Sequence, residues 1–225
     1  MLFRSGFAGA GREQSRAFYR SVLESAYPAA QIQIESDALI AYAGALGLNP
    51  GALLIAGTGS IAIGRKADGS MIRVGGWGPH FGDEGSGFWI GREAIRVALR
   101  EADSHSNQEF VSRIAGSLGV ASIQDAVGAW ASGTVTVPQI AELVPAVMEL
   151  WPAEPAAGIL RGAAAELRRL IDVAAERIDV SPCVRSVAGS IATHPLMREL
   201  IGVPFAEPRA EPARGAILLA MRNPH

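Results

Sequence analysis

The chain has 225 residues, enough for one large domain or two small ones, and 49% of them are hydrophobic, which is ample for a packed core. Its formal net charge of −2 gives no electrostatic attraction to nucleic acid or to an anionic membrane, so neither is expected as a partner. The single Cys183 excludes an intramolecular disulfide framework and a multi-cysteine metal site, and a cytoplasmic location is expected. No apolar run reaches the roughly 18 residues that would span a bilayer, and the N-terminus lacks the apolar segment of a signal peptide.

The first fifty residues suggest a small α/β unit. Residues 2–12 are glycine-rich, and because no strand precedes their GFAGAG segment we interpret them as a loop. Apolar spacing predicts a helix over 13–27, ended by Pro28, and alternation predicts a half-buried strand over 31–35.

Ser36 is placed to cap a helix over 37–48, which puts Asp37 in its first turn. Asp37 would then follow a strand, at the sheet edge where open α/β folds bind ligands. The alternative is that its charge only complements the helix dipole. The residue pattern leaves both interpretations open.

The stretch 52–90 carries three glycine-rich segments between predicted strands 52–56, 61–65 and 70–74 and a predicted helix 85–101. The first segment is Gly57-Thr58-Gly59-Ser60, whose amides and hydroxyls could bind a phosphate, although a simple tight turn is the alternative. The second is the GGWG of residues 75–78, and the third is the GDEGS of residues 82–86. This mixture of glycines, hydroxyls and acids suits a phosphorylated or polyhydroxylated small molecule.

Within these segments, Trp77 could be a core residue or an apolar wall for a sugar face. The acids Asp83 and Glu84 precede the predicted helix and could favour its N-terminus electrostatically. Two neighbouring acids exceed what one cap requires, and each carboxylate oxygen can accept a strong hydrogen bond from a hydroxyl-rich ligand.

From residue 107 onward, apolar spacing predicts a scaffold of helices over 107–118, 122–131, 137–150 and 156–178. His105 and His194 have no partner at metal-ligand spacing, so neither is expected to bind a metal. A strand over 183–187, the turn Ala188-Gly189-Ser190 and a helix over 194–200 predict a second amide-rich cradle. A last helix is expected over 213–221.

The ordered motifs are SDA at 36–38, PGALLIAGTGSIAIGR at 50–65, then DG, RVGGWG, GDEGSG, AGS and ARGAILLA. This set resembles the N-acetylglucosamine/glucosamine kinases of the BadF/BadG/BcrA/BcrD-type ATPase family, in the actin-like, hexokinase-type superfamily. The resemblance implies an α/β fold: a ribonuclease-H-like lobe at 51–212, with a mixed sheet and flanking helices, beside a truncated remnant of a smaller N-terminal lobe at 1–50. Residues 213–225 would form a C-terminal helix that could pack back on that lobe.

The resemblance also implies roles for individual residues. Asp37 corresponds to the base that acts on the 6-hydroxyl of an amino sugar, glucosamine or N-acetylglucosamine. The residues carried over as cofactor-binding, for ATP with Mg²⁺, are Gly57, Thr58, Gly59 and Ser60 in the second phosphate loop and Gly189 and Ser190 beside the adenosine. Those carried over as sugar-binding are Gly76, Trp77, Gly78, Asp83 and Glu84. A homodimer is a further expectation from the family.

One departure from the family pattern bears on activity. The family begins with a first phosphate loop of the type D-G-G-G-T, and no such segment occurs in this chain. We therefore expect an N-terminally short chain with weak or no kinase activity, and a non-catalytic sugar- or nucleotide-binding remnant is the alternative. An ATP-hydrolysing activator of 2-hydroxyacyl-CoA dehydratase type is disfavoured, since Cys183 offers no cysteine pair and GGWG favours a sugar.

Overall fold

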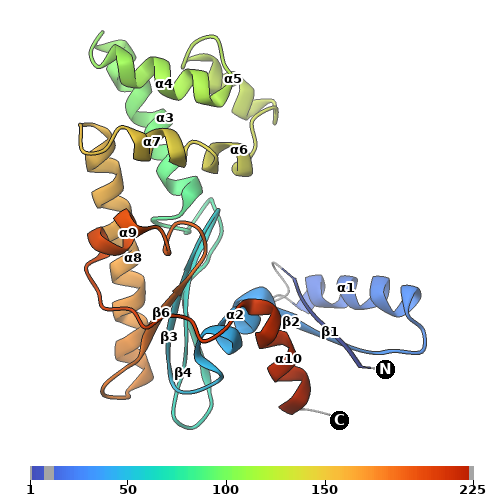
Figure 1. Ribbon diagram of the computed structural model, residues 1–225. Coiled ribbons are helices and arrows are strands. Elements are labelled where there is room, and N and C mark those ends of the chain that lie inside the picture. The colour runs from blue at the N-terminus through green and yellow to red at the C-terminus, as the bar shows by residue number, and fades with distance from the viewer. Residues whose placement is uncertain (1, 8–12, 223–225) are drawn as a thin grey trace.

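The computed structural model describes residues 2–7 and 13–222 and shows a mixed α/β architecture (Figure 1). The strands are β1 (Leu2–Phe7), β2 (Gln31–Ser36), β3 (Gly51–Ala56), β4 (Ser60–Arg65), β5 (Met71–Gly75) and β6 (Arg185–Ala188). The helices are α1 (Glu13–Ala26), α2 (Asp37–Leu46), α3 (Gly87–Asp103), α4 (Gln108–Leu118), α5 (Asp125–Ala131), α6 (Val137–Ala141), α7 (Val144–Glu149), α8 (Ala156–Ile178), α9 (Pro195–Ile201) and α10 (Pro212–Arg222). The expected fold class, a mixed sheet with flanking helices, is confirmed.

The main sheet has the strand order β5-β4-β3-β6. β3 pairs antiparallel with β4 and parallel with β6, and β4 pairs antiparallel with β5. Successive residues of β3 point to opposite faces, so that Leu54 joins the core beneath α8 while Leu53 joins the core beneath α2. β3 is therefore buried on both faces, and Figure 1 shows α8 and α2 on opposite sides of the sheet.

The helices α3 to α7 form a layer beyond one end of this sheet (Figure 1). The sequence predicts one helix over 137–150, which is wrong, because the structure has α6 and α7 with a break between them. Pro145 lies in the first turn of α7, and a proline cannot donate the backbone hydrogen bond that a continuous helix would need there. The break keeps Leu143 and Val147 buried in the main core.

The N-terminal region is a second, smaller sheet in which β1 pairs in parallel with β2. The interpretation of residues 2–12 as a loop is wrong for 2–7, because strand β1 forms there; residues 8–12, with Gly9 and Gly11, lie outside the described part. Parallel strands are joined by a long connection, so β1 pairs with a strand that lies far along the chain. The residues next to β1 therefore carry no hairpin signal that would predict it. α1 packs on β2 through Tyr19 and Leu23, against Ile32 and Ile34.

The C-terminal helix α10 packs against α2. The chain just before it is held by two backbone hydrogen bonds, from Arg209 N–H to the Ala45 carbonyl and from Ala210 N–H to the Gly44 carbonyl, both 3.0 Å. The two helices lie side by side in Figure 1. The last helix therefore returns to the N-terminal third of the chain, while the domain limits 1–50, 51–212 and 213–225 stay a prediction.

Candidate functional site

Three glycine-rich turns lie at one edge of the main sheet, and the strand register explains why. β3 and β6 are parallel, so the turns that follow Ala56 and Ala188 leave the sheet at the same edge. β4 begins at this edge with Ser60, opposite Ala56, and β5 ends there, because Gly75 pairs with Ile61. The GTGS, AGS and GGWG segments are thus brought together from distant parts of the sequence. We call this the glycine edge.

Backbone hydrogen bonds hold the GTGS turn, both within the turn and to the start of α3. The Gly57 N–H donates to the Gly59 carbonyl at 2.9 Å, which closes the turn. The carbonyls of Gly57 and Thr58 accept from the N–H groups of Gly87 and Phe88, at 2.7 and 3.1 Å. The start of α3 therefore holds the turn in place, and the Thr58 side chain is left exposed.

The Ser60 side chain supports the turn from beneath. It is buried, and its Oγ donates to the Glu84 carbonyl at 2.7 Å. The hydroxyl hydrogen is used within the protein in this structure, whereas the hydroxyl of Thr58 faces solvent. The two hydroxyls that the sequence places together are thus in different environments.

Asp83 lies between the GTGS and GGWG turns. A Cβ built on Gly59 would lie 2.9 Å from Asp83 Oδ2, so the carboxylate sits directly against that glycine. Burial raises the pKa of Asp83, and Glu84 acts in the same direction. The backbone amides of Ser60 and Gly78 oppose this shift by stabilising the charged carboxylate, as does the charge of Arg73.

Trp77 projects from the GGWG turn and is 64% exposed, so its interpretation as a core residue is wrong. The Arg73 guanidinium carbon lies 5.0 Å from the centre of the Trp77 ring, within the range of a cation–π contact. Arg73 also donates from Nε to the Gly75 carbonyl at 3.0 Å and from a terminal nitrogen to the Gly76 carbonyl. This arginine shapes the turn, and sequence reasoning missed it; its place two residues before GGWG was the available signal.

The AGS turn packs against the end of β3. Gly189 has a φ of +87°, and a side chain there would collide with the Ala56 carbonyl. That same carbonyl accepts from the N–H groups of Ile191 and Ala192, at 2.9 and 3.2 Å. Ser190 is exposed, and its Oγ lies 3.9 Å from a Cβ built on Gly57, so AGS and GTGS are neighbours.

Asp37 is the first residue of α2, as expected. Ser36 caps the helix by accepting from the Leu39 N–H at 3.2 Å, while Asp37 is exposed and its Oδ1 accepts from the Ala38 N–H at 2.9 Å. The other end of α2 is fixed to the start of β3, since Tyr42 Oη donates to the carbonyls of Asn49 and Gly51 at 2.7 and 3.0 Å. β3 then runs back along α2, so the N-terminal end of α2 points toward the glycine edge.

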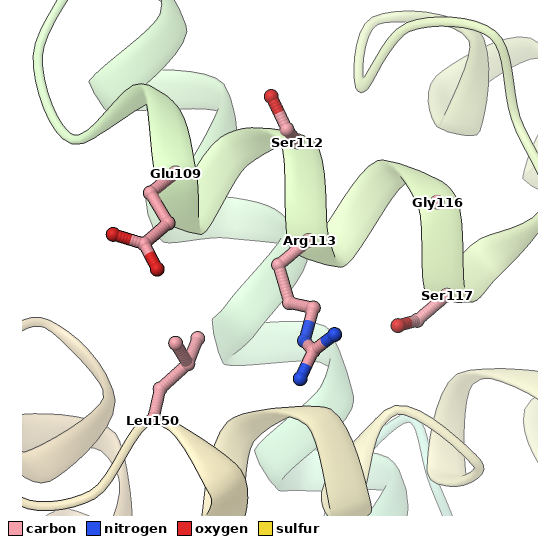
Figure 2. A pocket seen from close by; sticks show the side chains of 6 residues that line it. All are labelled: Glu109, Ser112, Arg113, Gly116, Ser117 and Leu150. Atoms are coloured by element: carbon pink, nitrogen blue, oxygen red, sulfur yellow. The ribbon is translucent and has the colours of Figure 1, made fainter.

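A separate hollow lies in the helical layer, away from the glycine edge. It has a volume of about 580 Å³ and is lined by Glu109, Ser112, Arg113, Gly116, Ser117 and Leu150. Figure 2 shows Arg113 extending from α4 toward the segment that carries Leu150, and Arg113 forms an ion pair with Glu149. None of the site residues predicted from the sequence lines this hollow.

Two further observations concern the described residues as a whole. Among them, no group of three or more His, Cys, Asp or Glu side chains is placed to hold a metal ion. No helix in the described part of the chain is long and apolar enough to cross a membrane.

Comparison with known proteins identifies the class. The sequence pattern of the BadF/BadG/BcrA/BcrD ATPase family matches residues 3–220 of this chain. The chain belongs to this family, as its motifs predict. The family is one of ATPases, which implies a nucleotide site.

Curated relatives match over less than half of the chain. An N-acetylmuramic acid/N-acetylglucosamine kinase of Clostridium acetobutylicum is 39% identical over 106 residues, which are 47% of this chain and 35% of the relative. An N-acetyl-D-glucosamine kinase of Dictyostelium discoideum is 37% identical over 100 residues, or 44% of this chain and 31% of the relative. The matched part thus spans about a third of each relative.

Solved structures match over nearly the whole chain. A proposed N-acetylglucosamine kinase from Chromobacterium violaceum is 26% identical with a TM-score of 0.77, over 97% of this chain and 75% of the other. A proposed N-acetylglucosamine kinase from Porphyromonas gingivalis shares the fold, with 20% identity and a TM-score of 0.79, over 100% of this chain and 78% of the other.

Proposed function

We propose that this chain carries the greater part of an ATP-dependent kinase that phosphorylates the 6-hydroxyl of an amino sugar, glucosamine or N-acetylglucosamine. The observation that supports it most is the gathering of three glycine turns, Asp83 and the exposed Trp77 at one sheet edge, toward which the start of α2 points. The names of the curated relatives and of the Chromobacterium structure suggest the substrate class.

On the nucleotide side, the proposal assigns the GTGS turn to the phosphates and Gly189 and Ser190 to the adenosine. The two turns are neighbours, and neither Thr58 nor Ser190 is buried. Backbone amides in such turns can bind phosphate oxygens without a charged side chain.

On the sugar side, the proposal assigns Gly76, Trp77 and Gly78 to one face of the ring and Asp83 and Glu84 to its hydroxyls. The ring of Trp77 is available as an apolar platform because most of it is exposed. A carboxylate already stabilised by backbone amides has remaining lone pairs that can accept from sugar hydroxyls.

In the proposed reaction, Asp37 accepts the proton of the 6-hydroxyl while that oxygen bonds to the γ-phosphorus and the bond to the ADP oxygen breaks. Positioning and charge stabilisation supply most of the acceleration in such transfers. Mg²⁺, bound together with ATP, would supply neutralisation of the phosphate charge in this transfer.

The test compares wild type with Asp37→Asn and with Asp103→Asn, a change at an exposed acid at the far end of α3. Each protein, in excess over the sugar, is incubated with ATP, Mg²⁺ and glucosamine or N-acetylglucosamine. The sugar phosphate that forms is measured over a single turnover. We expect Asp37→Asn to lower the rate by at least about a hundredfold and Asp103→Asn to leave it unchanged. A rate equal in all three proteins would contradict the role of Asp37.

The second candidate is a sugar- or nucleotide-binding protein without turnover, because the turns and the exposed Trp77 of the glycine edge can bind a ligand without catalysis. Thermal unfolding with ATP, glucosamine and N-acetylglucosamine distinguishes the two candidates. Stabilisation by a ligand with no sugar phosphate formed would favour the binder.

A further inference from the structure

Asp83 is in contact with both loops to which the proposed function assigns different ligands. On the phosphate side, its Oδ2 lies against Gly59, and the Ser60 amide stabilises its charge. On the sugar side, Gly82, the residue before Asp83, lies against Trp77, since a Cβ built on Gly82 would be 2.9 Å from the Trp77 Cβ, and the Gly78 amide opposes the rise in the pKa of Asp83.

The backbone around Asp83 is held to both loops as well. The Ser60 hydroxyl donates to the Glu84 carbonyl, and the Gly87 N–H donates to the Gly57 carbonyl, so residues 84–87 are fixed to the phosphate loop. The Gly82 N–H donates to the Gly78 carbonyl at 2.9 Å, which ties the residue before Asp83 to the sugar loop. A shift of either loop must therefore move or release the carboxylate.

The charge of Asp83 matters because its neighbours here are N–H donors. An ionised carboxylate can accept from the amides of both loops at once. Asparagine at this position has one acceptor oxygen, and its NH₂ group would face one of the two amides. Asp83→Asn thus keeps the size of the side chain and breaks the connection to one loop.

We propose that Asp83 is a positioning residue that couples the phosphate loop to the sugar loop, so that each ligand binds more tightly when the other loop is in place. This rests on the proposed function for the identity of the two ligands, whereas the coupling of the loops rests on the contacts alone. By linkage, a coupling that raises sugar affinity with nucleotide bound raises nucleotide affinity with sugar bound by the same factor.

The first experiment needs no ligand. The full chain is labelled with 5-fluorotryptophan, and the ¹⁹F resonance of Trp77 is identified by its loss in Trp77→Phe, since the chain has 4 tryptophans. Gly59→Ala places a methyl group 2.9 Å from Asp83 Oδ2, and we expect it to shift the Trp77 resonance. In the Asp83→Ala background, which removes the carboxylate that the methyl group would press, the same change should no longer shift it. A shift of equal size in both backgrounds would overturn the coupling.

The second experiment measures ADP and glucosamine affinities separately by calorimetry. We expect Asp83→Asn to weaken ADP binding at least about fivefold with no sugar present, although Asp83 belongs to the sugar side. Gly59→Ala, on the phosphate side, should weaken glucosamine binding with no nucleotide present. Loss of glucosamine affinity in Asp83→Asn with ADP affinity unchanged would overturn the proposal, because Asp83 would then contact only sugar.

Two controls keep the outcomes separate. Thermal unfolding of Asp83→Asn shows whether the variant folds, and if it does not, the Gly59→Ala result on glucosamine decides alone. A wild-type chain that binds neither ADP nor glucosamine would contradict the proposed function, while the ligand-free experiment still decides the coupling.

Discussion

The main sheet and the N-terminal sheet differ in how thoroughly they are buried. β3 has buried residues on both faces, against α8 and against α2, and Leu53 and Leu54 are completely inaccessible to solvent. α1, in contrast, has no buried residue along its described length, and Phe18 on it is 64% exposed. The glycine edge thus stands on a scaffold buried on two sides, whereas the helix that covers the N-terminal sheet stays at least partly exposed along its whole described length.

This contrast has a consequence for the proposed site. The turns of the glycine edge are held by strand register and by the start of α3, so they should be formed before any ligand binds. Asp37 lies where β2, the strand on which the exposed helix α1 packs, meets α2, whose far end is fixed to the main sheet. Substitutions in the N-terminal sheet should therefore alter the position of Asp37, and substitutions in the main sheet should alter the positions of the glycine turns.

The largest expected effect on stability comes from the scaffold. Leu167 in α8 is fully buried, and a Cβ built on Gly85 would lie 2.7 Å from its Cγ. We expect Leu167→Ala to lower the free energy of unfolding by about 2–5 kcal/mol through lost burial and a cavity. Urea unfolding followed by circular dichroism measures this. A loss below about 1 kcal/mol would contradict the packing described for α8.

A smaller effect should appear as a pH dependence caused by Asp83. Burial raises its folded-state pKa above the ordinary 3.8, with Glu84 adding to the shift and Arg73 and the Ser60 and Gly78 amides opposing it. The folded state then binds the proton more tightly than the unfolded state, so the contribution of Asp83 to stability falls as pH rises from the ordinary pKa through the raised one. The difference in unfolding free energy between wild type and Asp83→Asn, measured from pH 3 to 7, should show this fall. A difference that rises with pH in this window would contradict the shift.

The smallest expected effect comes from the same chemical change on the exposed surface of the C-terminal helix. Leu218 lies on α10, the helix packed on α2, and is 41% exposed. We expect Leu218→Ala to cost about 1 kcal/mol or less, because little burial is lost. It is the matched control for Leu167→Ala in the same urea series. Equal losses in the two variants would contradict the difference in burial between the two leucines.

The sequence was enough to predict most of the main sheet, because β3, β4 and β5 are consecutive and separated by recognisable glycine turns. It also placed Ser36 as the cap of α2 and the helix α8 at its observed limits. Strand β1 was missed because its pairing with β2 is parallel and non-local. The break between α6 and α7 was missed because the apolar spacing continues across it.

Within the candidate site, motif order predicted which segments matter and not how their side chains are used. The buried hydroxyl of Ser60 and the exposed ring of Trp77 depend on what packs beside each turn, which no local pattern encodes. Arg73 was missed because its contacts with Trp77 and the Gly75 carbonyl exist only once β5 ends in its turn. The position of Asp83 between two loops likewise follows from strand register rather than from spacing.

The most direct test of the central claim, that the glycine edge binds both ligands, is amide hydrogen exchange with and without ADP and glucosamine. We predict that ADP slows exchange at residues 57–60 and 188–190, and that glucosamine slows it at 75–84, relative to the free chain. Protection confined to residues 109–117, beside the hollow of Figure 2, with the glycine edge unchanged, would contradict the account.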